Sequence, residues 1–256
     1  MLHPLVIANW KMNIPSGGIS SWIQNEMISN KNDEEDFENK SSYFKFMGIA
    51  PPISHLTELK NLFNFGFLGV QDISKYNDGA KTGDISADMV IEKGCSFSIL
   101  GHSERREFYN ETNSIVSEKL RVCIEKDITP VVCIGESLDD FNATKTLDIL
   151  EMQLKEIFTS ISTKKTILIA YEPVWAIGSG KTPSTDEVNN IHQHIKDIVQ
   201  SVANIEAINI IYGGSVNCEN AKNFFRQSNI DGALIGGASL NGKDFLGIYN
   251  DFLETL

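Results

Sequence analysis

Thr166-Ile-Leu-Ile-Ala-Tyr171 is an apolar run rich in β-branched residues, and it ends directly in Glu172-Pro173. Its residues do not alternate between apolar and polar, which is typical of a parallel strand covered on both faces. Because proline cannot donate to a sheet, we expect the strand to stop there and to leave Glu172 at its carboxyl end. A carboxylate beside such a core is costly unless it is paired or used, so Glu172 is a candidate functional residue.

Seven further apolar runs occur along the chain, separated by stretches with helix-like spacing. This alternation is typical of βα units that build a parallel sheet. Eight such units in 256 residues favour a closed (β/α)8 barrel, an α/β fold of eight parallel strands surrounded by helices, formed as one domain over residues 1–256. The predicted strands are Leu5–Trp10, Tyr43–Ala50, Phe65–Gln71, Phe97–Gly101, Thr129–Ile134, Thr166–Tyr171, Ile208–Tyr212 and Gly232–Ile235, with two of the helices over Asp139–Ser162 and Ser184–Val202.

The composition limits the partners and the location of the protein. A formal charge of −12 argues against nucleic acid, which requires clustered Lys and Arg. Four cysteines without a C-x-x-C pair favour a reducing compartment without disulfides, and Cys133 is interpreted as a small buried apolar residue. No basic leader and no apolar run of membrane-spanning length is present, so we expect a cytoplasmic protein without a membrane partner.

Polar residues follow the first and fourth strands, at the end where barrel enzymes carry their chemistry. Asn9 and Lys11 end the first strand. His102 follows the fourth strand near a helix start, where the backbone dipole favours a neutral imidazole. These three residues and Glu172 form the candidate catalytic set.

Glycines after the last two predicted strands indicate an anion site. Gly213-Gly214 and Gly236-Gly237 allow backbone N–H groups to approach a phosphate, and barrels commonly bind phosphate at these two strands. Tight packing alone could explain one pair. After Glu172, Gly178-Ser-Gly180 lies between Pro173 and Pro183, which favours a lid, since an ordinary strand-to-helix connection does not need paired glycines between two prolines.

The spacing of residues excludes several other functional motifs. Gly180-Lys-Thr182 resembles the end of a P-loop, but the first glycine would fall at Trp175. A hydrolase G-x-S-x-G would need glycine at Arg105. His192 and His194 are two apart on a predicted helix and cannot share a metal ligand face, so we expect no metal site.

Six motifs together strongly resemble the triosephosphate isomerase family, in that family's order and over nearly the whole chain. This family is itself a standard example of the TIM barrel, its lid and its pKa tuning, so those general rules are not independent support. The resemblance implies a cofactor-free interconversion of dihydroxyacetone phosphate and D-glyceraldehyde 3-phosphate through an enediol or enediolate, in glycolysis and gluconeogenesis. The motifs are Asn9-Trp-Lys11, Gly101-His-Ser-Glu-Arg-Arg106, Cys133-Ile-Gly-Glu136, Tyr171-Glu-Pro-Val-Trp-Ala-Ile-Gly178, Tyr212-Gly-Gly-Ser215 and Gly236-Gly-Ala-Ser239.

The resemblance also implies a role for each matching residue. Glu172 would be the base, neutral His102 the electrophile, Lys11 a fixed positive charge, and Asn9 would orient the reacting oxygens. The remaining assignments fall into two groups. The substrate-binding residues would be Asn9, Lys11, Gly178, Ser215, Gly236 and Gly237, of which all but Asn9 would meet the phosphate. The supporting residues would be Glu104 near Lys11, Cys133, Glu136 holding Trp175 in the open lid, Ile177 and Leu240 clamping over Glu172, and Tyr212 with Ser215 latching the closed lid.

Family members usually form homodimers, and this implies that Gln71 to Ser86 reaches Met12 of a second subunit, with Thr82 near Asn9 and Asp84 facing Arg105. Two residues of this interface depart from the family's pattern, since Asp84 replaces a usual Glu and Lys81 replaces a residue that is often aromatic or apolar.

Two other functions remain open: another phosphosugar isomerase or epimerase barrel, and a non-catalytic sugar-phosphate-binding scaffold. The acidic stretch 31–42 is interpreted as a surface insertion or solvated helix end.

Overall fold

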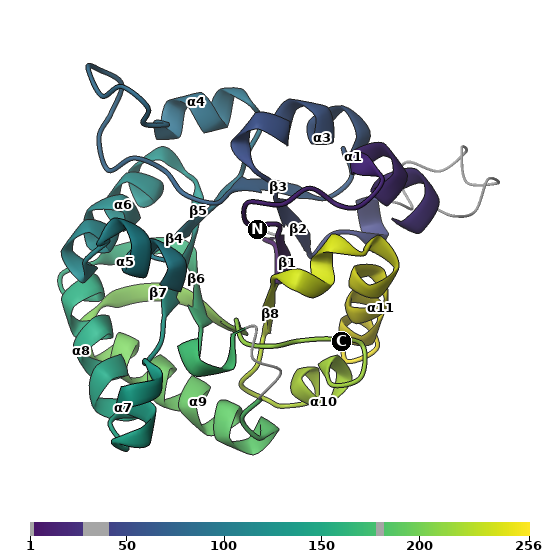
Figure 1. Ribbon diagram of the computed structural model, residues 1–256. Helices are drawn as coiled ribbons and strands as arrows, with labels where there is room; N and C mark the ends of the chain where they lie inside the picture. The colour runs from purple at the N-terminus through teal and green to yellow at the C-terminus, as the bar shows by residue number, and fades with distance from the viewer. Residues whose placement is uncertain (1–2, 28–40, 178–181) are drawn as a thin grey trace.

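The structure is a computed structural model and describes residues 3–27, 41–177 and 182–256. Within these ranges eight parallel strands pair in chain order, and the last pairs with the first, so the sheet closes into a barrel with helices around it (Figure 1). The predicted α/β barrel is confirmed. The strands are β1 (Val6–Asn9), β2 (Met47–Ala50), β3 (Phe67–Val70), β4 (Phe97–Leu100), β5 (Thr129–Ile134), β6 (Ser162–Tyr171), β7 (Asn204–Tyr212) and β8 (Gly232–Ile235).

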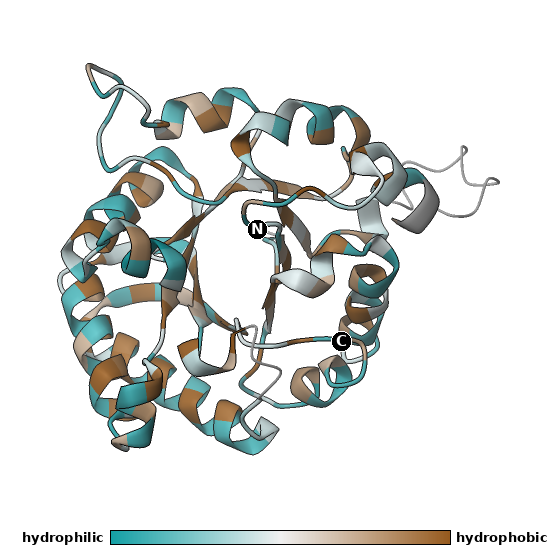
Figure 2. Ribbon diagram, in the orientation of Figure 1, coloured by the Kyte–Doolittle hydropathy of each residue, from teal (hydrophilic) through white to brown (hydrophobic). Residues whose placement is uncertain are grey.

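The helices alternate with these strands along the chain. Their inner faces and the strands form one apolar core, which Figure 2 shows as brown strands inside a ring of banded helices. The helices are α1 (Gly18–Ser21), α3 (Leu56–Leu62), α4 (Ala87–Glu92), α5 (Ser103–Tyr109), α6 (Asn113–Lys126), α7 (Leu138–Asn142), α8 (Thr146–Phe158), α9 (Thr185–Val202), α10 (Ala221–Phe225) and α11 (Gly242–Leu253), with η1 (Trp22–Met27), a π-helix, and the short 3₁₀ turns η2 (Ile53–His55), η3 (Val174–Ala176) and η4 (Gly237–Leu240).

Several predicted boundaries are wrong, by one or two residues in β1, β3 and β4 and by more in four other elements. Tyr43–Phe46 do not belong to β2, because this segment turns and packs its aromatic rings, as in the edge-to-face contact of Phe44 with Phe63. Strands β6 and β7 begin four residues earlier than predicted, since their polar first residues pair with each other, Ser162 opposite Asn204. The predicted helix over Asp139–Ser162 is two helices, and Thr144, with a left-handed φ of 56°, lies in the break between them.

The connection between β3 and α4 has the predicted bounds, 71–86, and projects from the ring of helices in Figure 1. The predicted start of α9 is also confirmed: the Ser184 hydroxyl accepts from the Glu187 N–H, and the Glu187 carboxylate accepts from the Ser184 N–H. Most of the acidic stretch 31–42 lies outside the described residues. Among the helices that are described, none combines the length and apolar character of a membrane span.

Candidate active site

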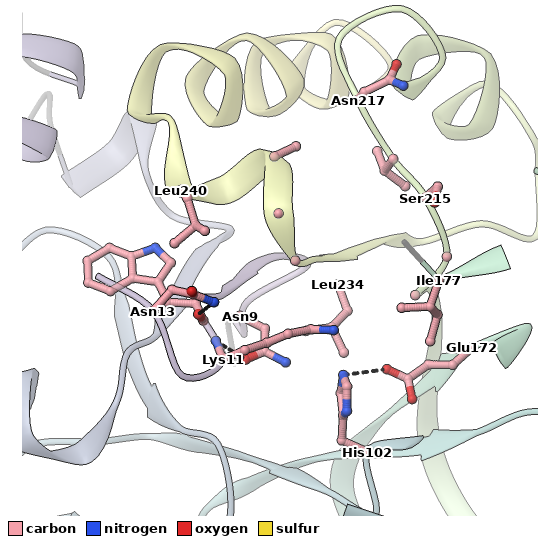
Figure 3. Close-up of a pocket in the computed structure, with 17 residues that line it drawn as sticks. Asn9, Lys11, Asn13, His102, Glu172, Ile177, Ser215, Asn217, Leu234 and Leu240 are labelled. Atoms are coloured by element: carbon pink, nitrogen blue, oxygen red, sulfur yellow. Dashed lines mark hydrogen bonds and ion pairs between the residues drawn. The ribbon is translucent and has the colours of Figure 1, made fainter. Parts of the chain in front are cut away.

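The barrel topology brings the four candidate catalytic side chains to one cavity. Asn9 ends β1, His102 follows β4 by two residues and Glu172 directly follows β6, so all three come from carboxyl ends of strands. With Lys11 they line a cavity of about 490 Å³ at that end of the barrel (Figure 3). The chain therefore places a carboxylate, an imidazole, an ammonium and an amide around a space large enough for a small substrate.

Glu172 is almost fully buried and has two close partners. Its Oε1 lies 3.1 Å from His102 Nε2, and its Oε2 accepts the Ser103 N–H at 3.0 Å (Figure 3 draws the first contact). His102 Nδ1 accepts the Glu104 N–H at the start of α5, so Nδ1 carries no proton. The remaining proton of a neutral imidazole then lies on Nε2 and faces the carboxylate, which is the tautomer expected at a helix N-terminus.

Lys11 reaches the cavity from a strained backbone. Its φ is 52°, in the left-handed region, which costs on the order of 1–3 kcal/mol for a non-glycine residue. The Lys11 N–H donates to Asn9 Oδ1 at 3.0 Å, and Lys11 Nζ forms a 2.6 Å ion pair with Glu104. A Cβ on Gly236 would stand 3.4 Å from Lys11 Cε, which is an ordinary van der Waals contact, so the lysine side chain passes close to Gly236 without requiring glycine there.

Two glycines allow close packing around Glu172. A Cβ on Gly135 would stand 1.7 Å from the Glu172 carbonyl oxygen, and one on Gly213 would stand 2.8 Å from Glu172 Cγ. Both positions therefore exclude a larger residue. The sequence suggested an anion-binding role for Gly213, and its contact with the carboxylate stem is a further reason for glycine that spacing alone could not reveal.

Cys133 at the end of β5 is fully buried, as predicted. Burial raises the pKa of its thiol well above the ordinary value, and the neighbouring Glu172 carboxylate raises it further. A thiol of this kind is not a nucleophile at neutral pH. Arg106 links the ends of β4 and β5, because its Nε donates to the Gly101 carbonyl at 2.7 Å and its Nη2 donates to the Cys133 carbonyl at 3.0 Å.

The first turn of the predicted lid is held by one acceptor, the Glu136 carboxylate, and by one donor, the Ser215 hydroxyl. Trp175 Nε1 donates to Glu136 at 2.8 Å, and the Tyr171 hydroxyl lies 3.2 Å from both oxygens of the same carboxylate. Burial raises the pKa of Glu136, although these donors oppose the rise. Farther on, the Ser215 hydroxyl donates to the Ala176 carbonyl at 2.7 Å.

All but one of the remaining predicted phosphate and clamping residues lie around the cavity. Ile177, Ser215, Gly236, Gly237 and Leu240 all line the cavity, whereas Gly178 lies outside the described residues.

Tyr212 is the last residue of β7, and its buried hydroxyl has no hydrogen-bond partner among the described residues. A Cβ on Gly214 would stand 2.2 Å from this hydroxyl, so glycine is required there.

Sequence reasoning missed several residues of the cavity. Ser103, whose N–H holds the Glu172 carboxylate, lay inside a motif that was noted for His102. Asn13, Asn217 and Leu234 also line the cavity, and nothing in their spacing distinguished them from ordinary loop and strand residues.

Three of the predicted interface residues, Met12, Gln71 and Arg105, line a second cavity beside the first. Met12 is 94% exposed, and Gln71 joins the strand ends by donating to the Lys11 and Ala50 carbonyls at 2.8 and 3.0 Å. Thr82 and Asp84 are exposed on the projecting connection, where Asp84 accepts from Ser74 at 2.6 Å.

Arg105, the predicted partner of Asp84 across the interface, forms ion pairs within its own chain to Asp72 and Glu111 at 2.9 and 2.6 Å. Its guanidinium is therefore already engaged by two carboxylates. The sequence did not single out either of them.

Metal binding was not expected from the sequence. In the part of the chain that the structure describes, no group of three or more His, Cys, Asp or Glu side chains has the arrangement of a metal site.

Fold and site define a (β/α)8-barrel protein with a carboxylate–imidazole pair and a lysine at the carboxyl-terminal mouth. Residues 4–252 match the profile of the family described as triosephosphate isomerase. The chain is 37% identical to the triosephosphate isomerase of Alkaliphilus oremlandii, over 98% of this chain and 100% of that protein. It is 38% identical to that of Psychromonas ingrahamii (97% and 98% covered) and 40% identical to that of Francisella tularensis subsp. mediasiatica (97% of each). The chain belongs to the triosephosphate isomerase family.

Proposed function

We propose that this protein is an enzyme that interconverts dihydroxyacetone phosphate and D-glyceraldehyde 3-phosphate without a cofactor. The observation that carries the proposal is the buried Glu172 carboxylate 3.1 Å from His102 Nε2, in a cavity that Lys11 also lines. The names of the relatives support the same reaction.

Glu172 removes a proton from the carbon beside the substrate carbonyl and returns it to the neighbouring carbon. The Nε2–H of His102 polarises the carbonyl oxygen and moves protons between the two oxygens, because its Nδ1 is already occupied by the Glu104 N–H. Lys11 stabilises the negative charge of the enediolate, and Asn9 orients the reacting oxygens. The phosphate binds at Gly178, Ser215, Gly236 and Gly237, which lets the reacting carbons lie toward Glu172.

Glu172 must exchange partners during this cycle. In the structure its Oε2 accepts the Ser103 N–H, which holds the carboxylate beside α5. Closure of the lid brings Ile177 and Leu240 over Glu172, excludes water and strengthens the carboxylate as a base. Tyr212 and Ser215 then hold the closed lid. The Tyr212 hydroxyl, which has no hydrogen-bond partner among the residues that the structure describes, is available for this contact.

We also propose that the chain forms one domain and works as a cytoplasmic homodimer. Met12, Gln71, Thr82, Asp84 and Arg105 contribute to the contact between subunits. The 94% exposure of Met12 beside exposed aromatic residues of α5 supports this surface. Sedimentation of the purified protein at micromolar concentration should give twice the mass of the chain, and a monomer under these conditions would refute the dimer.

The deciding experiment is a coupled assay with D-glyceraldehyde 3-phosphate, run with and without a metal chelator. We expect turnover that the chelator does not change. A five-carbon sugar phosphate tests the alternative phosphosugar isomerase or epimerase, since preferred turnover of that substrate would replace the proposed reaction. Binding of a triose phosphate without turnover would identify a scaffold instead.

A further inference from the structure

Trp175 makes a second contact that the family resemblance did not imply. Its indole stacks on the ring of Phe141, with ring centroids 4.2 Å apart and ring planes 28° from parallel. The indole N–H is held by Glu136 at 2.8 Å. Trp175 is thus fixed at its edge by a hydrogen bond and at its face by an aromatic ring.

The stacking ring is itself held in place by local structure. Helix α7, which carries Phe141, begins with a capping box in which the Ser137 hydroxyl accepts the Asp140 N–H and the Asp140 carboxylate accepts from Ser137. At its other end the Thr144 N–H donates to the Phe141 carbonyl at 3.0 Å. Phe141 is 41% exposed, so burial in the barrel core does not account for a large apolar ring at this position.

Both contacts come from one segment. Glu136 and Phe141 lie on the connection that follows β5 and on α7, and α7 packs against η3, which carries Trp175. The family resemblance implies that Glu136 holds Trp175 only while the lid is open. An indole that leaves Glu136 on closure would also leave Phe141, because a stack at 4.2 Å tolerates little displacement. A contact made in only one of two arrangements shifts the equilibrium between them.

We propose that Phe141 is a positioning residue that stabilises the open arrangement of the lid by stacking on Trp175, and thereby limits the fraction of molecules that are closed. This inference rests on the proposed function, in which the lid closes over a bound triose phosphate. Aromatic pairs contribute enough to change such an equilibrium roughly twofold to twelvefold. Loss of the ring therefore favours the closed arrangement and tightens any ligand that binds it alone.

The test uses the full-length protein and 2-phosphoglycolate, whose planar carboxylate resembles the enediolate in charge and shape. Phe141→Leu keeps an apolar side chain and removes the ring. We expect this variant to bind 2-phosphoglycolate about twofold to twelvefold more tightly than the unmodified protein and to show a lower KM without a higher kcat. Phe141→Tyr keeps the ring and should restore the original affinity and KM.

A matched control separates the stack from damage to α7. Leu138→Ala truncates another exposed apolar residue of the same short helix, and we expect it to leave the affinity for 2-phosphoglycolate unchanged. The position of the indole can be followed by ¹⁹F NMR after incorporation of 5-fluorotryptophan, with the Trp175 resonance assigned by its loss in Trp175→Phe. We expect this resonance to move toward its ligand-bound position in Phe141→Leu but not in Leu138→Ala.

Equal or weaker binding by Phe141→Leu, or equal tightening by Leu138→Ala, would overturn the role of the stack. These results are distinguishable from a failure of the proposed function. In that case the unmodified protein itself would not turn over D-glyceraldehyde 3-phosphate.

Discussion

Glu172 Oε1 and His102 Nε2 lie 3.1 Å apart, which joins a buried carboxylate directly to a buried imidazole. Because His102 Nδ1 accepts a backbone N–H, the imidazole is neutral with its proton toward Glu172. A carboxylate and an imidazole therefore stand in contact, and the proposed mechanism requires the substrate to come between them. The four predictions below test the site and the structure that supports it.

Glu172→Asp retracts the carboxylate by one methylene. We expect kcat to fall about 100-fold with a much smaller change in KM, since a displacement of roughly 1 Å from a productive geometry can have that effect. Steady-state kinetics with D-glyceraldehyde 3-phosphate measure both constants, and circular dichroism checks the fold. An unchanged kcat would remove Glu172 from the role of base.

Lys11→Ala removes the ammonium that lines the cavity beside Gly236. We expect weaker binding of 2-phosphoglycolate and a lower kcat, because the same charge acts on the phosphate and on the enediolate. Calorimetry and kinetics on one preparation give the two values. Glu104→Gln is the companion variant, since it breaks the 2.6 Å ion pair of Lys11 but keeps the ammonium, and its loss of activity should be smaller.

The sequence was sufficient to predict the fold and the place where the four candidate catalytic side chains meet, because that place is set by the carboxyl ends of the strands. Asn9, His102 and Glu172 each follow an apolar run, and parallel strands in a closed barrel bring such residues to one mouth. The helix start at Ser184 could likewise be predicted, since a capping box is a pattern of residues close together in the sequence.

Features that depend on contacts between distant segments could not be predicted. The helix break at Thr144 needs a left-handed φ, and the residue there is not the glycine that usually signals this conformation in a sequence. The tight fit of Gly135 against the Glu172 carbonyl and the stack of Phe141 on Trp175 each join residues from different βα units. Periodicity and capping describe one segment at a time, so they carry no information on such pairs.

Lys119→Met tests the charged cluster behind the projecting connection. Lys119 Nζ contacts Asp72 at 2.6 Å and Glu111 at 2.5 Å, and Arg105 pairs with both carboxylates. Burial raises the pKa of Asp72 to about 6 despite these cations. For Glu111, burial acts in the same direction, but hydrogen bonds from Lys119 and Arg105 outweigh it and lower the pKa.

Removing the shared lysine leaves two largely buried carboxylates with Arg105 as their remaining cation among the described residues. We expect the free energy of unfolding to fall by about 3–5 kcal/mol in Lys119→Met, measured by urea unfolding. Lys126→Met on the same helix breaks a more exposed pair with Asp88 and should lose less than about 1 kcal/mol. Equal losses in the two variants would show that the buried cluster is no more important than a surface pair.

His192 on α9 makes stability depend on pH. It is fully buried, its Nδ1 donates to the Asn229 carbonyl at 3.0 Å, and burial lowers its pKa from 6.5 to about 3. The folded protein therefore keeps His192 neutral at pH values where the unfolded chain takes up a proton. The resulting stability is fully present above pH 6.5 and is lost progressively as the pH falls from there toward 3.

The loss from this residue should approach about 1.4 kcal/mol per pH unit and reach about 2 kcal/mol near pH 5. Urea unfolding at a series of pH values from 7.5 to about 5 measures it against His192→Asn, whose amide nitrogen can replace Nδ1 as the donor but does not titrate. The variant should be less stable at pH 7.5, yet the difference between the two proteins should shrink by about 2 kcal/mol as the pH falls to 5. Parallel pH dependences would mean that His192 is protonated to the same extent in both states, which its burial at the Asn229 carbonyl argues against.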